Sequence, residues 1–274
     1  MPKLKCDDTP ELEAIEETLY VPLLGRIYAD EHFPNILTDR TARELKDRLP
    51  ANIKGSDTQT QYTLLAGAVR SANMDRCISG FLDRNPDGVI VELGCGLETA
   101  YFRGGPGTGT WYEVDLPDVI EYRRSLLGER EDDILVSADA FSGEWMDIVR
   151  ERHPDSPVLV TASGLLYYFP RERVLGLLRG LRGRGRVEFV FDTVSSKGMA
   201  RMRGYMKKVG HADAAMHFCV DDAESFAAES GARLIAEEPY YAHTDRTGLS
   251  FITSATMRVS DRFMMVKMVH IALE

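Results

Sequence analysis

The sequence lacks the features of a membrane-spanning, secreted or zinc-binding protein. No apolar run approaches the roughly 18 residues that a membrane-spanning helix needs. The N-terminal segment contains no apolar stretch typical of a secretory signal. The cysteines lie far apart, with no metal-ligand spacing, at Cys6, Cys77, Cys95 and Cys219. We therefore expect a cytoplasmic protein with free thiols, no membrane association and no bound metal.

Basic side chains are in the minority. The chain holds 33 lysines and arginines against 43 aspartates and glutamates, which gives a formal net charge of −10. This balance is poorly suited to a nucleic-acid backbone, so we expect no nucleic-acid partner. The composition, 44% hydrophobic and 28% charged, is ordinary for a globular protein. A chain of 274 residues is long enough for one large α/β domain.

The first third of the chain is predicted to be helical. Residues 11–32 carry apolar side chains at helical spacing, with Pro22 as an expected kink or boundary. Residues 59–86 have the pattern of one long amphipathic helix that ends before Pro86, and residues 49–59 that of a loop. We expect residues 1–86 to form an N-terminal helical cap.

From residue 88 onward, short apolar runs alternate with segments that can form helices. The runs cover residues 88–94, 109–117, 132–139, 157–164 and 186–193. Runs that are polar only at their ends are typical of strands buried on both faces, and hence of a mostly parallel sheet covered by helices. Two more strand candidates, residues 231–241 and 261–273, are separated by an expected long loop. Residues 87–274 are thus predicted to be an α/β core that forms one compact unit with the cap.

The predicted carboxyl ends of these strands carry the residues suited to a ligand site. Gly94 and Gly96 allow a ligand to approach the backbone closely, because they have no Cβ. Asp115, on the next strand, is placed to accept hydrogen bonds from both hydroxyls of a ribose. Asp139, after the third strand, could accept from the amine of an adenine. Both acids could instead cap the following segments, and for Asp192 we favour a capping role. The three features in order favour an adenosine-type ligand.

The residues around the two glycines help to distinguish which adenosine-containing ligand the site would bind. Thr99 stands where a dinucleotide fingerprint would have its third glycine, and the chain has no Gly-Lys-Ser/Thr phosphate loop. Glu92, two residues before the first glycine, would repel a pyrophosphate. It suits a ligand with a positive centre.

These motifs resemble a known family. In order, "VELGCGLETAYFR", "WYEVDLPDVI", "SADAF" and "PVLVTASGLLYYFP" resemble the motifs of the leucine carboxyl methyltransferase family, above all its bacterial branch of O-methyltransferases in polyketide biosynthesis. The likeness covers roughly residues 11–195. It implies a Rossmann-like class I methyltransferase fold with a helical cap and S-adenosylmethionine as the cofactor.

The resemblance also implies roles for individual residues. The cofactor-binding set is Arg70, Glu92, Gly94, Gly96, Asp115, Leu116, Asp139, Ala140 and Ser163. Within it, Arg70 would pair with the cofactor's carboxylate, for which Arg26 is a weaker candidate, and Asp139 with Ala140 would contact the adenine. Tyr167 or Tyr168 would lie beside the acceptor.

Three residues differ from those that the family often has in these motifs. Glu98 and Ala100 replace an aspartate and an arginine that the family often has after the glycine turn. Ser163 replaces an acid that often precedes Gly164.

The leading hypothesis is O-methylation of a small molecule at a hydroxyl or a carboxylate, with a polyketide-like acceptor. The alternatives are a protein carboxyl methyltransferase, an NAD-dependent oxidoreductase and a module that binds the cofactor without catalysis. The missing third glycine and the lack of a plausible catalytic Tyr-x-x-x-Lys disfavour the oxidoreductase. No catalytic base is assigned, although His211, His217 and His243 fall in the C-terminal region. The oligomeric state is not predicted.

Overall fold

The computed structural model describes residues 10–49, 59–104, 109–208 and 216–273. Most of the loop predicted over residues 49–59 lies outside the described residues, as do Cys6 and His211.

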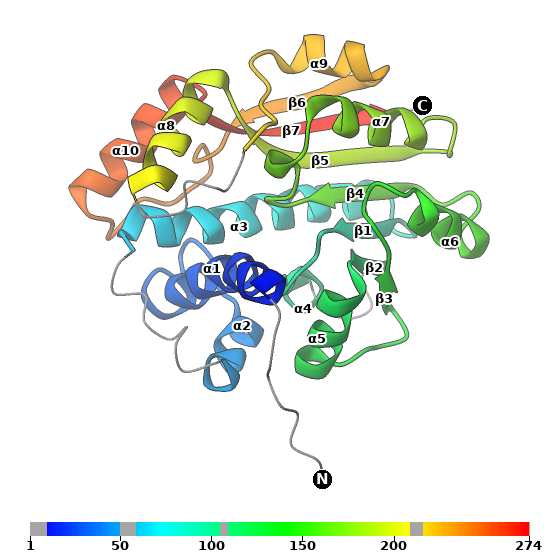
Figure 1. Ribbon diagram of the computed structural model, residues 1–274, viewed down its shortest axis with the longest axis horizontal. Coiled ribbons are helices and arrows are strands. Elements are labelled where there is room, and N and C mark those ends of the chain that lie inside the picture. Colours follow the sequence, from blue (N-terminus) through cyan, green and yellow to red (C-terminus); the bar gives the residue numbers. More distant parts are fainter. Residues whose placement is uncertain (1–9, 50–58, 105–108, 209–215, 274) are drawn as a thin grey trace.

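A seven-stranded sheet forms the centre of the molecule (Figure 1). Its strands are β1 (Val89–Leu93), β2 (Thr110–Asp115), β3 (Asp133–Ser137), β4 (Val158–Ala162), β5 (Val187–Val194), β6 (Arg233–Pro239) and β7 (Val266–Leu273). They are ordered β3-β2-β1-β4-β5-β7-β6, and β7 runs antiparallel to both of its neighbours. The central strands β1 and β4 are buried along their whole length. The predicted α/β class with a mostly parallel sheet is confirmed.

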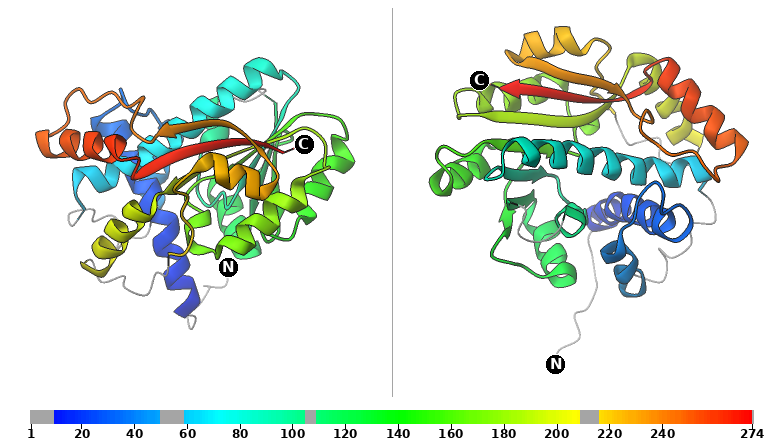
Figure 2. Two further views of the ribbon diagram at one scale, coloured as in Figure 1. Left: turned by 90° about the horizontal axis from the view of Figure 1, so that it is seen from above. Right: turned by 180° about the vertical axis from the view of Figure 1, so that it is seen from behind.

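Helices cover both faces of this sheet. One face packs against α6 (Glu144–Arg152), α7 (Arg171–Leu181) and α9 (Ala223–Ser230) through Trp145, Leu175 and Phe226. The other face packs against α3 (Gln61–Arg84), α4 (Ala100–Gly104) and α5 (Pro117–Leu127). Figures 1 and 2 show β6 and β7 lying between α9 and α3. The long helix predicted before Pro86 is therefore α3, which packs directly on the sheet.

Of the N-terminal helices, the first packs on α3 and the second packs on the first. They are α1 (Pro10–His32), α2 (Arg40–Leu45) and the 3-10 helix η1 (Lys46–Arg48). Helix α1 continues through Pro22, so the predicted boundary there is wrong. Gly25 lies so close to α3 that a Cβ there would overlap the carbonyl oxygen of Leu64. The division between residues 1–86 and 87–274 stays a prediction.

Three further elements lie beyond the carboxyl ends of the parallel strands: η2 (Leu166–Tyr168), α8 (Ser196–Lys208) and α10 (Phe251–Arg262) (Figures 1 and 2). The long loop predicted between β6 and β7 contains α10, so that prediction is wrong. Its buried face carries Thr253, Met257 and Ser260, whereas Phe251 and Ile252 are exposed. Because polar residues are buried and apolar residues are exposed in α10, the sequence lacks the apolar periodicity by which a helix packed against a core is usually predicted.

Candidate active site

The Gly-Cys-Gly turn follows β1 at the carboxyl edge of the sheet. Gly94 has a φ of +63° and Gly96 a φ of +48°, which is the left-handed region that favours glycine. The N–H of Gly94 donates to the carbonyl of Val114 at 2.8 Å and so ties the turn to β2. A Cβ on Gly94 would lie 2.8 Å from Leu165, and one on Gly96 would lie 2.9 Å from Leu19. The turn therefore needs glycine for its backbone and for the close approach of these two leucines.

Asp115 lies at the end of β2, beside the glycine turn. Its Oδ2 accepts a hydrogen bond from the N–H of Gly96 at 2.8 Å, and its Oδ1 accepts one from the N–H of Leu116 at 2.8 Å. Burial raises the pKa of Asp115, and these two backbone donors oppose that shift. Helix α5 has Leu116 as its N-cap, without a side-chain hydrogen bond. The alternative reading of Asp115 as the cap of this helix is therefore wrong.

Asp139 and Ala140 follow β3. The exposed Asp139 accepts a hydrogen bond from the N–H of Phe141 at 2.9 Å and forms an ion pair with Arg173 at 2.8 Å. It therefore caps its own turn, whereas Gly143 is the N-cap of α6. Ala140 is buried against this turn. An adenine amine at Asp139 would have to share the carboxylate with Arg173.

Arg70 reaches the same edge from α3. Its Nη1 lies 3.4 Å from Oδ2 of Asp192, and 19% of the Arg70 side chain is exposed. Burial lowers the pKa of Arg70, but Asp192 raises it, and the net value is above the ordinary one. Arg70 is thus a partly buried ion-pair partner of Asp192 rather than a fully solvated helix charge. The capping role that we favoured for Asp192 is wrong, because this acid lies inside β5 and binds other elements.

The residues after β4 differ in exposure. Ser163 is half-buried. Tyr167 is buried and donates its hydroxyl hydrogen to Asp192 at 2.8 Å, whereas 44% of Tyr168 is exposed. Burial raises the pKa of Tyr167 well above its ordinary value, so its phenol stays protonated. Tyr168 is therefore the more accessible of the two tyrosines.

A buried carboxyl pair lies beneath the glycine turn. Glu92 of β1 and Glu113 of β2 are direct neighbours in the sheet. Burial, followed by the charge of Glu113, raises the pKa of Glu92 well above its ordinary value. Arg123 of α5 lies 2.8 Å from Glu113 and donates hydrogen bonds to the carbonyls of Gly96 and Glu98. Arg123 thus holds the turn from below. The sequence reasoning missed it, because only its long-range contacts reveal the role.

A second charged cluster joins the cap to the same turn. The buried Arg26 of α1 donates to Asp39 at 3.1 Å and to Glu98 at 3.2 Å. Arg103 of α4 donates to Glu98 at 2.7 Å and to Asp39 at 2.8 Å. Burial alone would raise the pKa of Glu98, but Arg26 and Arg103 lower it well below the ordinary value. Arg26 is therefore engaged within the protein, and Arg103 supplies a guanidinium one helical turn after Ala100.

Of the three C-terminal histidines considered above, His217 and His243 lie within the described residues. The exposed His217 donates its backbone N–H to the carbonyl of Tyr167 at 2.8 Å, which places it at the carboxyl edge. His243 contacts Glu238 at 3.1 Å. In the described ranges, no group of three or more His, Cys, Asp or Glu side chains is arranged to hold a metal ion. Among the same residues, none of the helices has the length and apolar character needed to cross a membrane.

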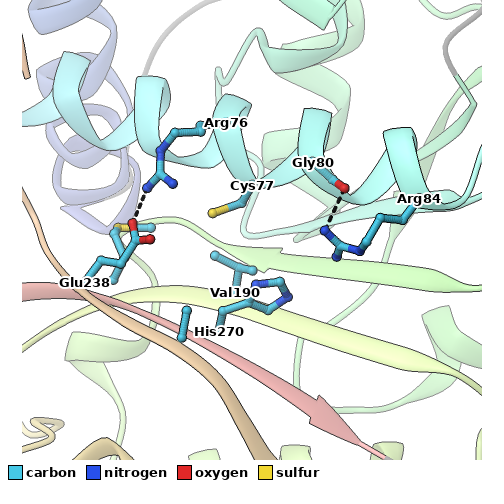
Figure 3. A pocket seen from close by; sticks show the side chains of 9 residues that line it. Arg76, Cys77, Gly80, Arg84, Val190, Glu238 and His270 are labelled. Atoms are coloured by element: carbon cyan, nitrogen blue, oxygen red, sulfur yellow. Dashed lines mark hydrogen bonds and ion pairs between the residues drawn. The ribbon is translucent and has the colours of Figure 1, made fainter. Parts of the chain in front are cut away.

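A cavity of about 180 Å³ lies elsewhere, between the second half of α3 and strands β5, β6 and β7 (Figure 3). Its lining is Arg76, Cys77, Gly80, Arg84, Val190, Ala236, Glu238, Met268 and His270. Arg76 forms an ion pair with Glu238 across it at 2.5 Å. None of the predicted site residues lines this cavity, so we place the candidate active site at the carboxyl edge.

The sheet order and the helices on both of its faces define a Rossmann-like α/β fold. Residues 14–182 match the model of the leucine carboxyl methyltransferase family, and the chain belongs to that family. The predicted resemblance is confirmed.

Two curated relatives are similar over part of their length. The tetracenomycin polyketide synthesis O-methyltransferase TcmP of Streptomyces glaucescens is 33% identical over 162 residues, which cover 59% of this chain and 58% of that protein. The S-adenosyl-L-methionine-dependent methyltransferase dpfgK of Gibberella zeae is 31% identical over 193 residues, which cover 64% and 63%. The chain thus spans less than two thirds of either relative.

A solved structure supports the fold alone. A DUF574-family protein from Streptomyces avermitilis superimposes with a TM-score of 0.54 at 12% sequence identity, covering 91% of this chain and 97% of that one.

Proposed function

We propose that the protein is an S-adenosylmethionine-dependent O-methyltransferase that acts on a small-molecule hydroxyl or carboxylate. The observation that carries this proposal is the hydrogen bond from the N–H of Gly96 to Asp115, because it unites the glycine turn and the acid of the next strand at one edge. Membership of a methyltransferase family supports the chemistry. The name of the relative TcmP supports an oxygen acceptor on a polyketide-like molecule.

The residues at this edge fit the proposed cofactor. Each oxygen of Asp115 accepts one backbone hydrogen bond, and a carboxylate has further lone pairs to accept from two ribose hydroxyls. Leu116 is 49% exposed and offers an apolar surface beside an adenine. Glu92 is buried next to Glu113, and burial with the charge of Glu113 raises its pKa well above the ordinary value, so it belongs to the base of the site. We therefore assign Asp115 and Leu116 to contact with the cofactor and Glu92 to the base beneath the glycine turn.

The bound cofactor supplies an electrophilic methyl group on a sulfonium, and the protein aligns the acceptor and excludes water. Tyr168 is exposed at the edge and is our candidate to contact the acceptor. A carboxylate acceptor needs no base, whereas a hydroxyl needs one or must already be ionised. The buried Tyr167 cannot serve as a base at neutral pH, because its pKa is raised well above the ordinary value by burial.

Calorimetric titration with S-adenosylhomocysteine tests the proposed site. We expect the wild type to bind and Asp115→Ala to bind about tenfold to a hundredfold more weakly, because charge-assisted hydrogen bonds to the ribose are lost. Asp118→Asn is the matched control, because this acid is exposed on the first turn of α5. Its affinity should equal that of the wild type. A wild type that does not bind, or an Asp115→Ala variant that binds equally well, would contradict the proposal.

Protein carboxyl methylation is the second candidate, because the description of the matching family names a leucine carboxyl group. The two functions differ in where a transferred methyl group appears, on a protein or on an extractable small molecule.

A further inference from the structure

A buried carboxylate lies beside the turn at which this chain has Ser163. The parallel pairing of β4 with β5 matches Ala162 with Phe191, so the next residues along the two strands, Ser163 and Asp192, are neighbours. Asp192 is 2% exposed. A buried carboxylate of the adjacent strand therefore lies beside the turn that carries Ser163 and Gly164.

Asp192 connects three elements of the site. Its Oδ1 accepts a hydrogen bond from the N–H of Gly164 at 2.7 Å. Its Oδ2 accepts one from the Tyr167 hydroxyl at 2.8 Å and lies 3.4 Å from Nη1 of Arg70. The turn after β4, η2 and α3 therefore meet at one carboxylate. A buried carboxylate needs such a set of donors and a cation to offset its lost hydration.

Gly164 fixes the position of Arg70 from the other side. Its φ is +70°, and a Cβ there would overlap the guanidinium of Arg70. Arg70 thus lies against the α-carbon of Gly164, in space that any side chain at this position would fill. A guanidinium carries five N–H groups in a planar fork, so the Nη1 contact with Asp192 is compatible with a second anion on the same group.

We propose that Asp192 is a positioning residue, which holds Arg70 and the Ser163–Gly164 turn so that Arg70 can pair with the carboxylate of the cofactor's methionine portion. This inference rests on the proposed function and deepens it. Asp192 acts through Arg70 and does not itself touch the ligand. Its Oδ2 orients the guanidinium, and its Oδ1 fixes the turn against which the guanidinium lies.

Two ligands that differ in the relevant carboxylate test this proposal by calorimetry. S-adenosylhomocysteine has the amino-acid carboxylate, and 5′-methylthioadenosine has the same nucleoside and thioether without it. We expect Asp192→Asn to weaken binding of S-adenosylhomocysteine about tenfold, because Arg70 loses its orienting charge. Binding of 5′-methylthioadenosine should change less than about twofold. Glu188→Gln is the matched control, because Glu188 is on the same strand but pairs with Arg84 and His270, and both affinities should be unchanged.

A double-mutant cycle shows whether the effect passes through Arg70. Arg70→Met should weaken S-adenosylhomocysteine selectively, and adding Asp192→Asn to it should cause little further loss. Gly164→Ala should also weaken S-adenosylhomocysteine, because a Cβ at this position would overlap the guanidinium of Arg70. If Asp192→Asn does not fold, Gly164→Ala serves as the test in its place. An unchanged affinity of that variant for S-adenosylhomocysteine would overturn the inference.

The outcomes separate the inference from the proposed function. A wild type that binds neither ligand overturns both. A wild type that binds S-adenosylhomocysteine, with Asp192→Asn binding as tightly, overturns the inference alone. An equal loss of both ligands in folded Asp192→Asn also overturns it, because the whole site would then have changed.

Discussion

At the scale of single residues, Glu113 makes the stability of the protein depend on pH. Burial raises its pKa from 4.5 to about 7, against the opposing charge of Arg123. Between these two values the folded state binds a proton that the unfolded state has lost. The free energy of unfolding therefore falls as the pH rises from about 4.5 to about 7, by a few kcal/mol at most. Below pH 4.5 Glu113 is protonated in both the folded and the unfolded state, so its titration no longer changes the free energy of unfolding.

Glu113→Gln should reduce this slope, because a glutamine does not titrate. The check is urea unfolding at pH 5, 6, 7 and 8, in which the slope of the unfolding free energy against pH is compared with that of the wild type. Glu121→Gln, at an exposed position of the same helix as Arg123, should leave the slope unchanged. An identical slope in Glu113→Gln and the wild type would contradict the raised pKa.

The residues of the site divide into those that local sequence reveals and those that it does not. Gly94, Gly96 and Asp115 follow their strands directly, and the structure places them together as expected. Asp192 was assigned to a cap because its neighbours in the chain suggest one. Its partners Arg70 and Gly164 lie 122 and 28 residues away, so only the folded chain brings them together.

At the scale of elements, the crossing of α1 and α3 depends on a glycine. A Cβ on Gly25 would overlap the backbone of α3, and backbone cannot rotate away as a side chain can. We expect Gly25→Ala to destabilise the protein by about 1–3 kcal/mol, which is the usual cost of overpacking. In α7, Gly176 has no atom within 4 Å of a Cβ, so Gly176→Ala should be neutral or stabilising by up to about 1 kcal/mol.

Thermal unfolding of the two alanine variants measures this contrast. Gly25→Ala should lower the midpoint temperature, and Gly176→Ala should leave it unchanged or raise it. Equal changes in midpoint temperature would contradict this, because they would show that helix propensity, rather than the contact between α1 and α3, determines the effect of Gly25→Ala.

Most elements could be predicted from the sequence, because the seven strands are short apolar runs and the long helix α3 has a helical periodicity. Helix α10 could not, since its buried positions are mostly hydroxyl-bearing and its apolar residues face outward. At Pro22 we expected a kink or a boundary, and the boundary is absent. Proline usually interrupts a helix, but here the helix continues against α3.

At the scale of the whole molecule, the sheet brings one edge together from distant parts of the chain. The position of β7 between β5 and β6 depends on pairing across the sheet, which no local pattern encodes. The cap joins this edge through Arg26 and Glu98, and α3 carries Arg70 to it. The site at this edge is therefore a product of the complete fold, and we propose that methyl transfer takes place there.

Incubation with methyl-labelled S-adenosylmethionine tests whether the protein methylates a small molecule. The enzyme is mixed with a metabolite extract rich in aromatic polyketides and, separately, with a protein lysate freed of small molecules. We predict label in an extractable small molecule, on oxygen, and its loss in Asp115→Ala. Label confined to protein, or no label despite binding of S-adenosylhomocysteine, would contradict small-molecule O-methylation.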